Sequence, residues 1–275
     1  MSDAFANAQV AGFLKQILNF APNYLPNGGA TFLGQTSAPL VAELSQYFEY
    51  KRDFTEPTSQ APTTLQPIGF KYVGDGNGNV VSIDGAGGLL QISATAVLND
   101  ESYLSADGLT SNANDFFNVT LNSGKKLWYE TRMRASQSGN NFSLFAGLFA
   151  SVAVAANALV DTTGAIADTD FVGFQIDPAL GTSWIYTHKK SGQTVQKQPA
   201  IAANDGSAYI KLGIYFDGAS SLSFYVNDVK VGTTVEVSAA TFPSGSGLVP
   251  AILLKSTSAA AKAAVVDYIH VIQSR

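Results

Sequence analysis

The chain contains no cysteine among its 275 residues. Disulfides, thiolate nucleophiles and cysteine-based zinc or iron–sulfur sites are therefore excluded. Histidine is nearly as scarce, with only His188 and His270, too few for most histidine-rich metal sites. We accordingly expect no metal ion and no cofactor.

Charge is also scarce. Asp, Glu, Lys and Arg make up 13% of the residues, against about 25% in an ordinary soluble domain. Two interpretations stay open: a large surface rich in Ala, Ser, Thr and Asn, or a surface partly buried in an assembly. The formal net charge is −5, and no cluster of Lys and Arg with interleaved aromatics is present. We therefore expect no nucleic-acid partner.

Long apolar runs are limited to residues 142–160, which carry no charge over 19 positions. That length could span a membrane as a helix. However, FSLFAGLF alternates as a strand does, Ser151 and Asn157 interrupt the run, and no basic residues flank it. We expect a core strand followed by an Ala-rich loop or short helix, and no membrane partner. The N-terminus lacks a positive region and carries Asp3, so it is not typical of a signal peptide.

The first 65 residues predict an appended arm. Residues 3–20 have the apolar spacing of an amphipathic helix, and residues 21–40 are rich in Pro, Gly and Asn. Residues 38–52 suggest a second short helix, and residues 55–67, with three prolines, suggest a linker. This segment is too small and too broken to fold alone.

The rest of the chain predicts strands, most clearly at residues 209–233. Apolar residues recur there at every second position, and turn residues interrupt them at Asp217-Gly218 and Asn227-Asp228. Period two with tight turns predicts a three-strand antiparallel meander. Fourteen such strands favour an all-β fold, a two-sheet antiparallel jelly-roll sandwich over residues 66–275, with a short helical, proline-rich N-terminal arm over residues 1–65.

The expected strands are 68–73, 79–83, 88–96, 115–121, 126–135, 142–150, 170–177, 183–189, 193–200, 208–216, 221–227, 229–235, 247–255 and 264–273.

Catalytic patterns are absent. Glycoside hydrolysis needs two carboxyl groups roughly 5–10 Å apart, but no expected strand carries two carboxylates at alternate positions. We expect Glu130 to form an ion pair with Arg132 on the same face of its strand. No G-x-S-x-G is present; we expect His188 to be exposed at a hairpin and His270 to be an ordinary strand residue. The sequence thus predicts no catalytic residue and a protein that is not an enzyme.

Two weaker patterns concern ligands. GDGNGN at 74–79 resembles the start of an EF-hand loop but lacks its sixth-position Gly and twelfth-position Glu, so a hairpin turn is favoured. Aromatics are abundant, with 17 Phe, 11 Tyr and two Trp. Most are expected in the core, but an exposed Trp128, Trp184 or Tyr could stack on a sugar ring.

Four segments, in order, resemble the concanavalin A-like lectin/glucanase jelly roll. They are LWYETRMR (127–134), FSLFAGLF (142–149) with DFVGFQID (170–177), the meander at 209–233, and VDYIHVIQSR (266–275). The E-x-D-x-x-E strand of laminarinase-like glucanases has no counterpart here. The whole pattern, with its low charge and helical arm, is similar to capsid decoration (cement) or head-fibre proteins of tailed bacteriophages.

That resemblance implies a non-enzymatic virion structural protein on the capsid surface, made in the host cytoplasm. Its partners would be the major capsid protein and copies of itself, most simply as a homotrimer. The alternative is a carbohydrate-binding, lectin-like module that recognises surface glycans. The predicted assembly interface comprises apolar residues of the arm: Phe5, Phe13, Leu14, Ile17, Leu18, Phe20, Leu40, Leu44, Tyr47 and Phe48.

Overall fold

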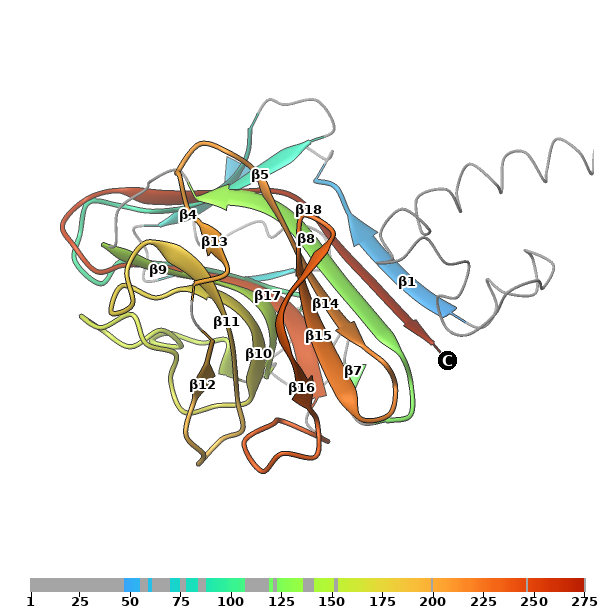
Figure 1. The fold of residues 1–275 in the computed structure, drawn as a ribbon. Helices are drawn as coiled ribbons and strands as arrows, with labels where there is room; N and C mark the ends of the chain where they lie inside the picture. Colours follow the sequence, from blue (N-terminus) through green and yellow to red (C-terminus); the bar gives the residue numbers. More distant parts are fainter. Residues whose placement is uncertain are drawn as a thin grey trace, which may run out of the picture.

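Two antiparallel β-sheets packed face to face form the fold (Figure 1). The computed structural model describes residues 47–54, 59–60, 70–74, 78–83, 88–106, 119–120, 123–135, 141–150, 153–198, 200–245 and 247–274. Every named secondary-structure element in these residues is a strand. The prediction of an all-β, two-sheet sandwich is therefore confirmed.

The first sheet, sheet A, has the strand order β16-β15-β14-β8-β18-β5-β4-β2, and β1 pairs with β18 beside β5. Its strands are β1 (Tyr47–Arg52), β2 (Ser59–Gln60), β4 (Asn79–Ile83), β5 (Leu89–Ala94), β8 (Leu127–Ala135), β14 (Ile210–Phe216), β15 (Ser221–Val226), β16 (Val229–Glu236) and β18 (Lys262–Ser274).

The second sheet, sheet B, has the order β12-β11-β10-β9-β17-β6-β3, with β13 paired to β11 and β7 paired to β17. Its strands are β3 (Lys71–Gly74), β6 (Glu101–Ser105), β7 (Val119–Thr120), β9 (Phe142–Ala150), β10 (Phe171–Ile176), β11 (Ser183–Lys189), β12 (Gln196–Lys197), β13 (Ala202–Ala203) and β17 (Gly247–Ser256).

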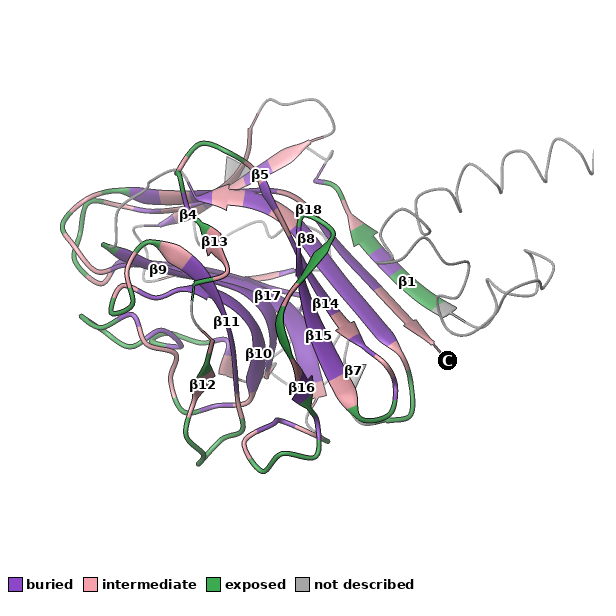
Figure 2. Cartoon of the chain, viewed as in Figure 1, coloured by how far each residue is buried: buried purple, intermediate pink, exposed green. Residues whose placement is uncertain are grey.

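The main core lies between the inner faces of the two sheets. Alternate residues of each strand enter it, as period two requires. On β8, Leu127, Tyr129 and Met133 belong to this core, whereas Trp128, Glu130 and Arg132 face away from it. Figure 2 shows the buried strands at the centre and exposed residues along β1 and β16.

Sheet B is covered on its outer face as well. A second apolar cluster there joins Phe145, Phe149 and Phe171 to Val154 and Leu159 of the segment 153–169. Because both faces of β9 are packed, its sequence FSLFAGLFA is nearly continuously apolar and almost entirely buried. The charge-free run that could have spanned a membrane thus begins as a core strand. In the residues described, no helix has the length and apolar character to cross a bilayer.

Some expected elements differ from the structure. Tyr47–Arg52 is strand β1 and not the end of a short helix, because its backbone pairs with β18 from Arg52↔Ile269 to Tyr47↔Ser274. Ser59–Gln60, within the expected linker, pairs with β4. The division of the chain at residues 65 and 66 stays a prediction.

The strand β6 was not predicted, because ESYLS combines a charge with small polar residues. All five of its residues are nevertheless buried. Glu101 is accommodated by Lys255 of the neighbouring β17, whose Nζ lies 3.0 Å from Glu101 Oε2. Because Glu101 and Lys255 are far apart in the sequence, their pairing produces no periodic pattern from which this strand could be predicted.

Candidate functional site

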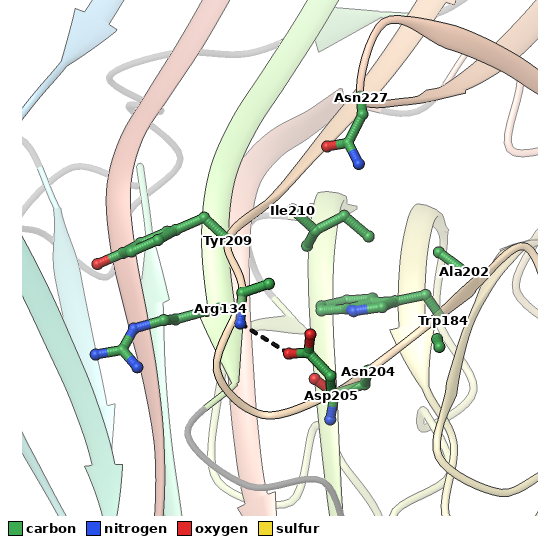
Figure 3. Close-up of a pocket in the computed structure, with 10 residues that line it drawn as sticks. Arg134, Trp184, Ala202, Asn204, Asp205, Tyr209, Ile210 and Asn227 are labelled. Atoms are coloured by element: carbon green, nitrogen blue, oxygen red, sulfur yellow. Dashed lines mark hydrogen bonds between the residues drawn. The ribbon is translucent and has the colours of Figure 1, made fainter.

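A small pocket lies at one end of the sandwich, where the start of β14 meets β11 and β13 of sheet B (Figure 3). Its volume is about 120 Å³. The indole of Trp184, buried within the sandwich, forms part of its wall. Polar groups surround the pocket and include those of Arg134, Asn204, Asp205, Tyr209 and Asn227.

The loop from β13 to β14 holds Asp205 in a fixed orientation. Asp205 Oδ1 accepts hydrogen bonds from the backbone N–H of Ser207 (2.8 Å) and of Ala208 (2.7 Å). These two bonds lower the pKa of Asp205, because they favour its charged form. Gly206 adopts a positive φ of 77° that closes the turn. The pocket therefore presents a carboxylate at neutral pH.

The turn between β15 and β16 supplies another wall. Asn227 and Asp228 have positive φ values of 49° and 68°, as the predicted Asn-Asp turn requires. Asn227 Oδ1 accepts a hydrogen bond from Lys211 N at 2.9 Å, and Lys211 Nζ pairs with Asp228 Oδ2 at 2.7 Å. The turn is thus fastened to β14 by both of its side chains.

Arg134 and Tyr209 extend side by side from the rim of the pocket (Figure 3). The guanidinium carbon of Arg132 lies 4.4 Å from the Tyr209 ring centroid, and that of Arg134 lies 5.4 Å from it. Arg132 also pairs with Asp267. This aromatic ring, in contact with two cations, forms the outer edge of the site.

The expected ion pair between Glu130 and Arg132 is not formed, although both project from the outer face of sheet A. The pairing of β18 with β8 shifts register between Val266 and Tyr268. Because of this irregularity, Asp267 lies beside Arg132 and forms an ion pair with it. The hydroxyl of Tyr268 lies beside Glu130 and donates a hydrogen bond to its carboxylate. Burial raises the pKa of Glu130, against the lowering effect of that hydrogen bond.

The two histidines occupy different environments. His270 lies on the outer face of sheet A, where its Nε2 is 2.8 Å from Glu49 Oε1. The contact with His270 lowers the pKa of Glu49.

His188, expected to be exposed, is instead buried with its ring 5.6 Å from that of Phe242. Burial lowers the pKa of His188 to about 4. The predicted hairpin is formed, since β11 pairs with β12. The expected exposure of His188 is wrong, because the segment around Phe242 covers this end of β11.

Neither tryptophan is an exposed platform. Trp128 is 2% exposed and packs against Tyr225, with ring centroids 5.4 Å apart. Trp184 is 1% exposed.

The pocket residues Arg134, Asp205 and Tyr209 were not recognised from the sequence. The Asp-Gly-Ser turn at 205–207 was a visible signal, but nothing in the sequence placed it beside β8 or β11.

Of the predicted assembly interface, Phe5, Phe13, Leu14, Ile17, Leu18, Phe20, Leu40 and Leu44 lie outside the described residues. Tyr47 pairs through its backbone with Ser274. Phe48 is 39% exposed on β1. The interface stays a prediction.

A metal site is not found in the part of the chain that the structure describes: no three His, Asp or Glu side chains gather there. Two residues of the loop that resembles an EF-hand, Asp75 and Asn77, lie outside that part.

No family model matches the sequence, and no curated protein matches it. Solved structures do share its fold. SCLam, a non-specific endo-β-1,3(4)-glucanase of family GH16, has a TM-score of 0.54 at 14% identity, covering 87% of this chain and 94% of that one. A glycoside hydrolase family protein from Mycobacterium thermorestibile has a TM-score of 0.55 at 15% identity, with 81% and 99% covered.

The GH16 protein of the Bacteroides ovatus mixed-linkage glucan PUL has a TM-score of 0.51 at 8% identity, covering 80% of this chain and 98% of that one. At these identities the likeness establishes the fold alone. The two-sheet sandwich is shared with these glycoside hydrolases, in agreement with the jelly-roll fold that the sequence motifs indicated.

These neighbours also correct the prediction that the chain is not an enzyme. That prediction is contradicted by glycoside hydrolases that share the fold over 80–87% of this chain at 8–15% identity. The missing E-x-D-x-x-E strand describes one arrangement of carboxylates on a fold that carries enzymes.

Proposed function

We propose that the protein binds carbohydrate at the pocket beside Trp184. The observation that carries this proposal is the combination of groups around one small cavity. A fixed carboxylate, two amide side chains and a guanidinium surround it, and Tyr209 lies at its rim. Planar polar groups of this kind hydrogen-bond to adjacent sugar hydroxyls, and an aromatic ring packs against the apolar face of a sugar.

The size of the pocket fits one end of a saccharide and not a long chain. At about 120 Å³ it is smaller than the roughly 300–1,000 Å³ of a typical small-molecule site. We therefore expect one terminal residue to enter and the rest to lie outside, across Tyr209. All hydrogen bonds described at Asp205 end on Oδ1, which leaves Oδ2 to accept from a sugar hydroxyl.

The choice of first ligands follows from the structural neighbours. SCLam is an endo-β-1,3(4)-glucanase, and the Bacteroides ovatus protein was solved with a mixed-linkage glucan product. Gluco-oligosaccharides with β-1,3 and β-1,4 linkages are thus the natural starting panel. Hydrolysis of the same panel should be assayed in parallel, because the fold is shared with hydrolases.

The test is calorimetric titration of the full chain and of two variants. Asp205→Ala removes the carboxylate and should weaken binding about tenfold or more, since a hydrogen bond to a charged group is lost. Asp168→Ala is the matched control. Asp168 also caps a turn, accepting from Gly192 N at 2.9 Å, but it lies beside Lys189, at the opposite end of β11 from Trp184. Equal binding by both variants would contradict the proposal.

A second candidate role is that of a virion structural protein on a bacteriophage capsid surface, bound to the major capsid protein and to copies of itself. The low charge content favours a surface that is partly covered. Strand β1 adds a structural argument, because it ties part of the predicted arm, residues 47–52, to β18. In this role the apolar residues of the predicted interface would bind a neighbouring protein.

This second role is tested by the mass of the protein in solution. A chain lacking residues 1–46 retains every described strand. The role predicts that the full chain is a homotrimer and that the truncated chain is a monomer that no longer binds capsid shells. The same oligomer in both proteins would contradict assembly through the arm.

A further inference from the structure

Arg134 differs from several other cations of the sandwich. Arg132, Lys189, Lys197, Lys211 and Lys255 each have a carboxylate oxygen within salt-bridge distance. Arg134 forms no ion pair with any residue that the structure describes. Its Nε is buried and has no hydrogen-bond partner. A buried N–H without an acceptor is unfavourable, and the charged guanidinium, which no described carboxylate neutralises, is suited to an anion from outside.

The position of Arg134 identifies where that acceptor would lie. Arg134 lines the pocket and extends outward along Tyr209 (Figure 3). Asp205 lines another part of the pocket, in the exposed loop between β13 and β14. The two charges divide the site: the part beside Asp205 disfavours a second carboxylate and accepts hydroxyl donors, whereas the part beside Arg134 favours an anion.

Resting on the proposed carbohydrate function, we propose that the pocket selects acidic saccharides, in which a sugar ring carries a carboxylate. The ring hydroxyls point to Asp205 and Asn227. The carboxylate points to the guanidinium of Arg134, which is always charged and can donate two parallel hydrogen bonds. Tyr209 covers the exposed side of the ring.

The overall charge of the chain makes this selectivity specific to the site. With a net charge of −5, the protein as a whole repels polyanions. A preference for an acidic saccharide would therefore come from local contacts and not from a general attraction.

The experiment compares two probes of equal length and linkage: a β-1,4-linked glucuronic acid tetrasaccharide and cellotetraose. Each is titrated into the full chain by calorimetry. We expect the acidic probe to bind about tenfold more tightly, as a charge-assisted pair provides. Arg134→Gln should abolish this preference, because it weakens binding of the acidic probe more than binding of cellotetraose. Arg134→Lys should retain part of it, because an ammonium supplies charge without the planar fork.

Lys125→Gln is the control, since it makes the same charge change at an exposed position before β8, whereas Arg134 lies near the end of that strand. Thermal midpoints of all variants check that the fold is kept. Equal affinity of the wild type for both probes would overturn the acidic preference and leave carbohydrate binding intact. Binding of neither probe would overturn both proposals. A preference that survives Arg134→Gln would show that another group selects the acid.

Discussion

The outer faces of the two sheets are completed in different ways. On sheet B, residues 153–169 cover the face and pack on Phe145, Phe149 and Phe171. On sheet A, the outer face carries ionisable side chains such as Glu130, Arg132 and His270. Each contacts one partner: Tyr268, Asp267 and Glu49, respectively. The outer side of sheet B therefore contributes mainly to stability. The outer side of sheet A carries polar and charged groups, which continue to Arg134 and Tyr209 at the pocket.

A buried ionic cluster fastens the covering segment to sheet B. Lys255 Nζ donates to Asn157 Oδ1 at 2.9 Å and to the Leu159 carbonyl at 2.7 Å, and it pairs with Glu101 and Asp161. Glu101 in turn accepts from Tyr103 and from the backbone N–H of Asn157. The cluster is fully paired, which is the condition under which a buried charge is tolerated.

The largest predicted effect comes from breaking this cluster. Lys255→Ala leaves Glu101 buried without its cation and should lower the free energy of unfolding by about 3–5 kcal/mol. Lys230→Ala, at an exposed position of β16 on sheet A, should change it by less than about 0.5 kcal/mol. Urea unfolding followed by circular dichroism measures both. A loss below about 1 kcal/mol for Lys255→Ala would refute the fastening role.

The next effect depends on pH. Because burial lowers the pKa of His188 to about 4, the unfolded chain, with an ordinary histidine pKa near 6.5, binds the proton more readily. The contribution of His188 to the free energy of unfolding is complete above pH 6.5. It falls by about 2–3 kcal/mol as the pH is lowered toward 4.

Replacing His188 by Leu should remove this loss, so the difference in unfolding free energy between variant and wild type should change between pH 7 and pH 4. His270→Gln, on the outer face of sheet A, keeps His188 and should still show the loss. The prediction fails if His188→Leu and wild type lose stability in parallel over that range.

A smaller effect compares glycines on the two outer faces. A Cβ on Gly147 in sheet B would lie 2.5 Å from the Cα of Gly173, which is backbone and cannot move freely. A Cβ on Gly213 in sheet A would meet the ring of Trp128 at 2.9 Å, a side chain that can shift. Gly147→Ala should cost about 1–3 kcal/mol and Gly213→Ala less, as measured by thermal unfolding. Equal costs would show that the two faces are equally rigid.

The sequence predicted the sandwich well where alternation was undisturbed. The strands at 79–83, 142–150 and 183–189 match the structure at both ends, since their turns and apolar periods are local signals. It failed for β6 and for His188, because burial there depends on Lys255 and on the segment around Phe242, both far along the chain.

The pocket was beyond prediction for the same reason. Its walls come from β8, β11, the loop before β14 and the turn after β15. The sequence pointed to the Asn227-Asp228 turn and to Trp184, but it did not show that they lie at one site. Which turn lies beside which strand is decided by the sheet order, and alternation within a strand does not reveal that order.

The most direct test of carbohydrate binding at the pocket is a titration of the full chain with the β-linked gluco- and glucurono-oligosaccharides, repeated with Asp205→Ala and Asp168→Ala. The account predicts binding that is weakened about tenfold or more by Asp205→Ala and unchanged by Asp168→Ala. Absence of binding to every saccharide, or equal binding by both variants, would contradict it.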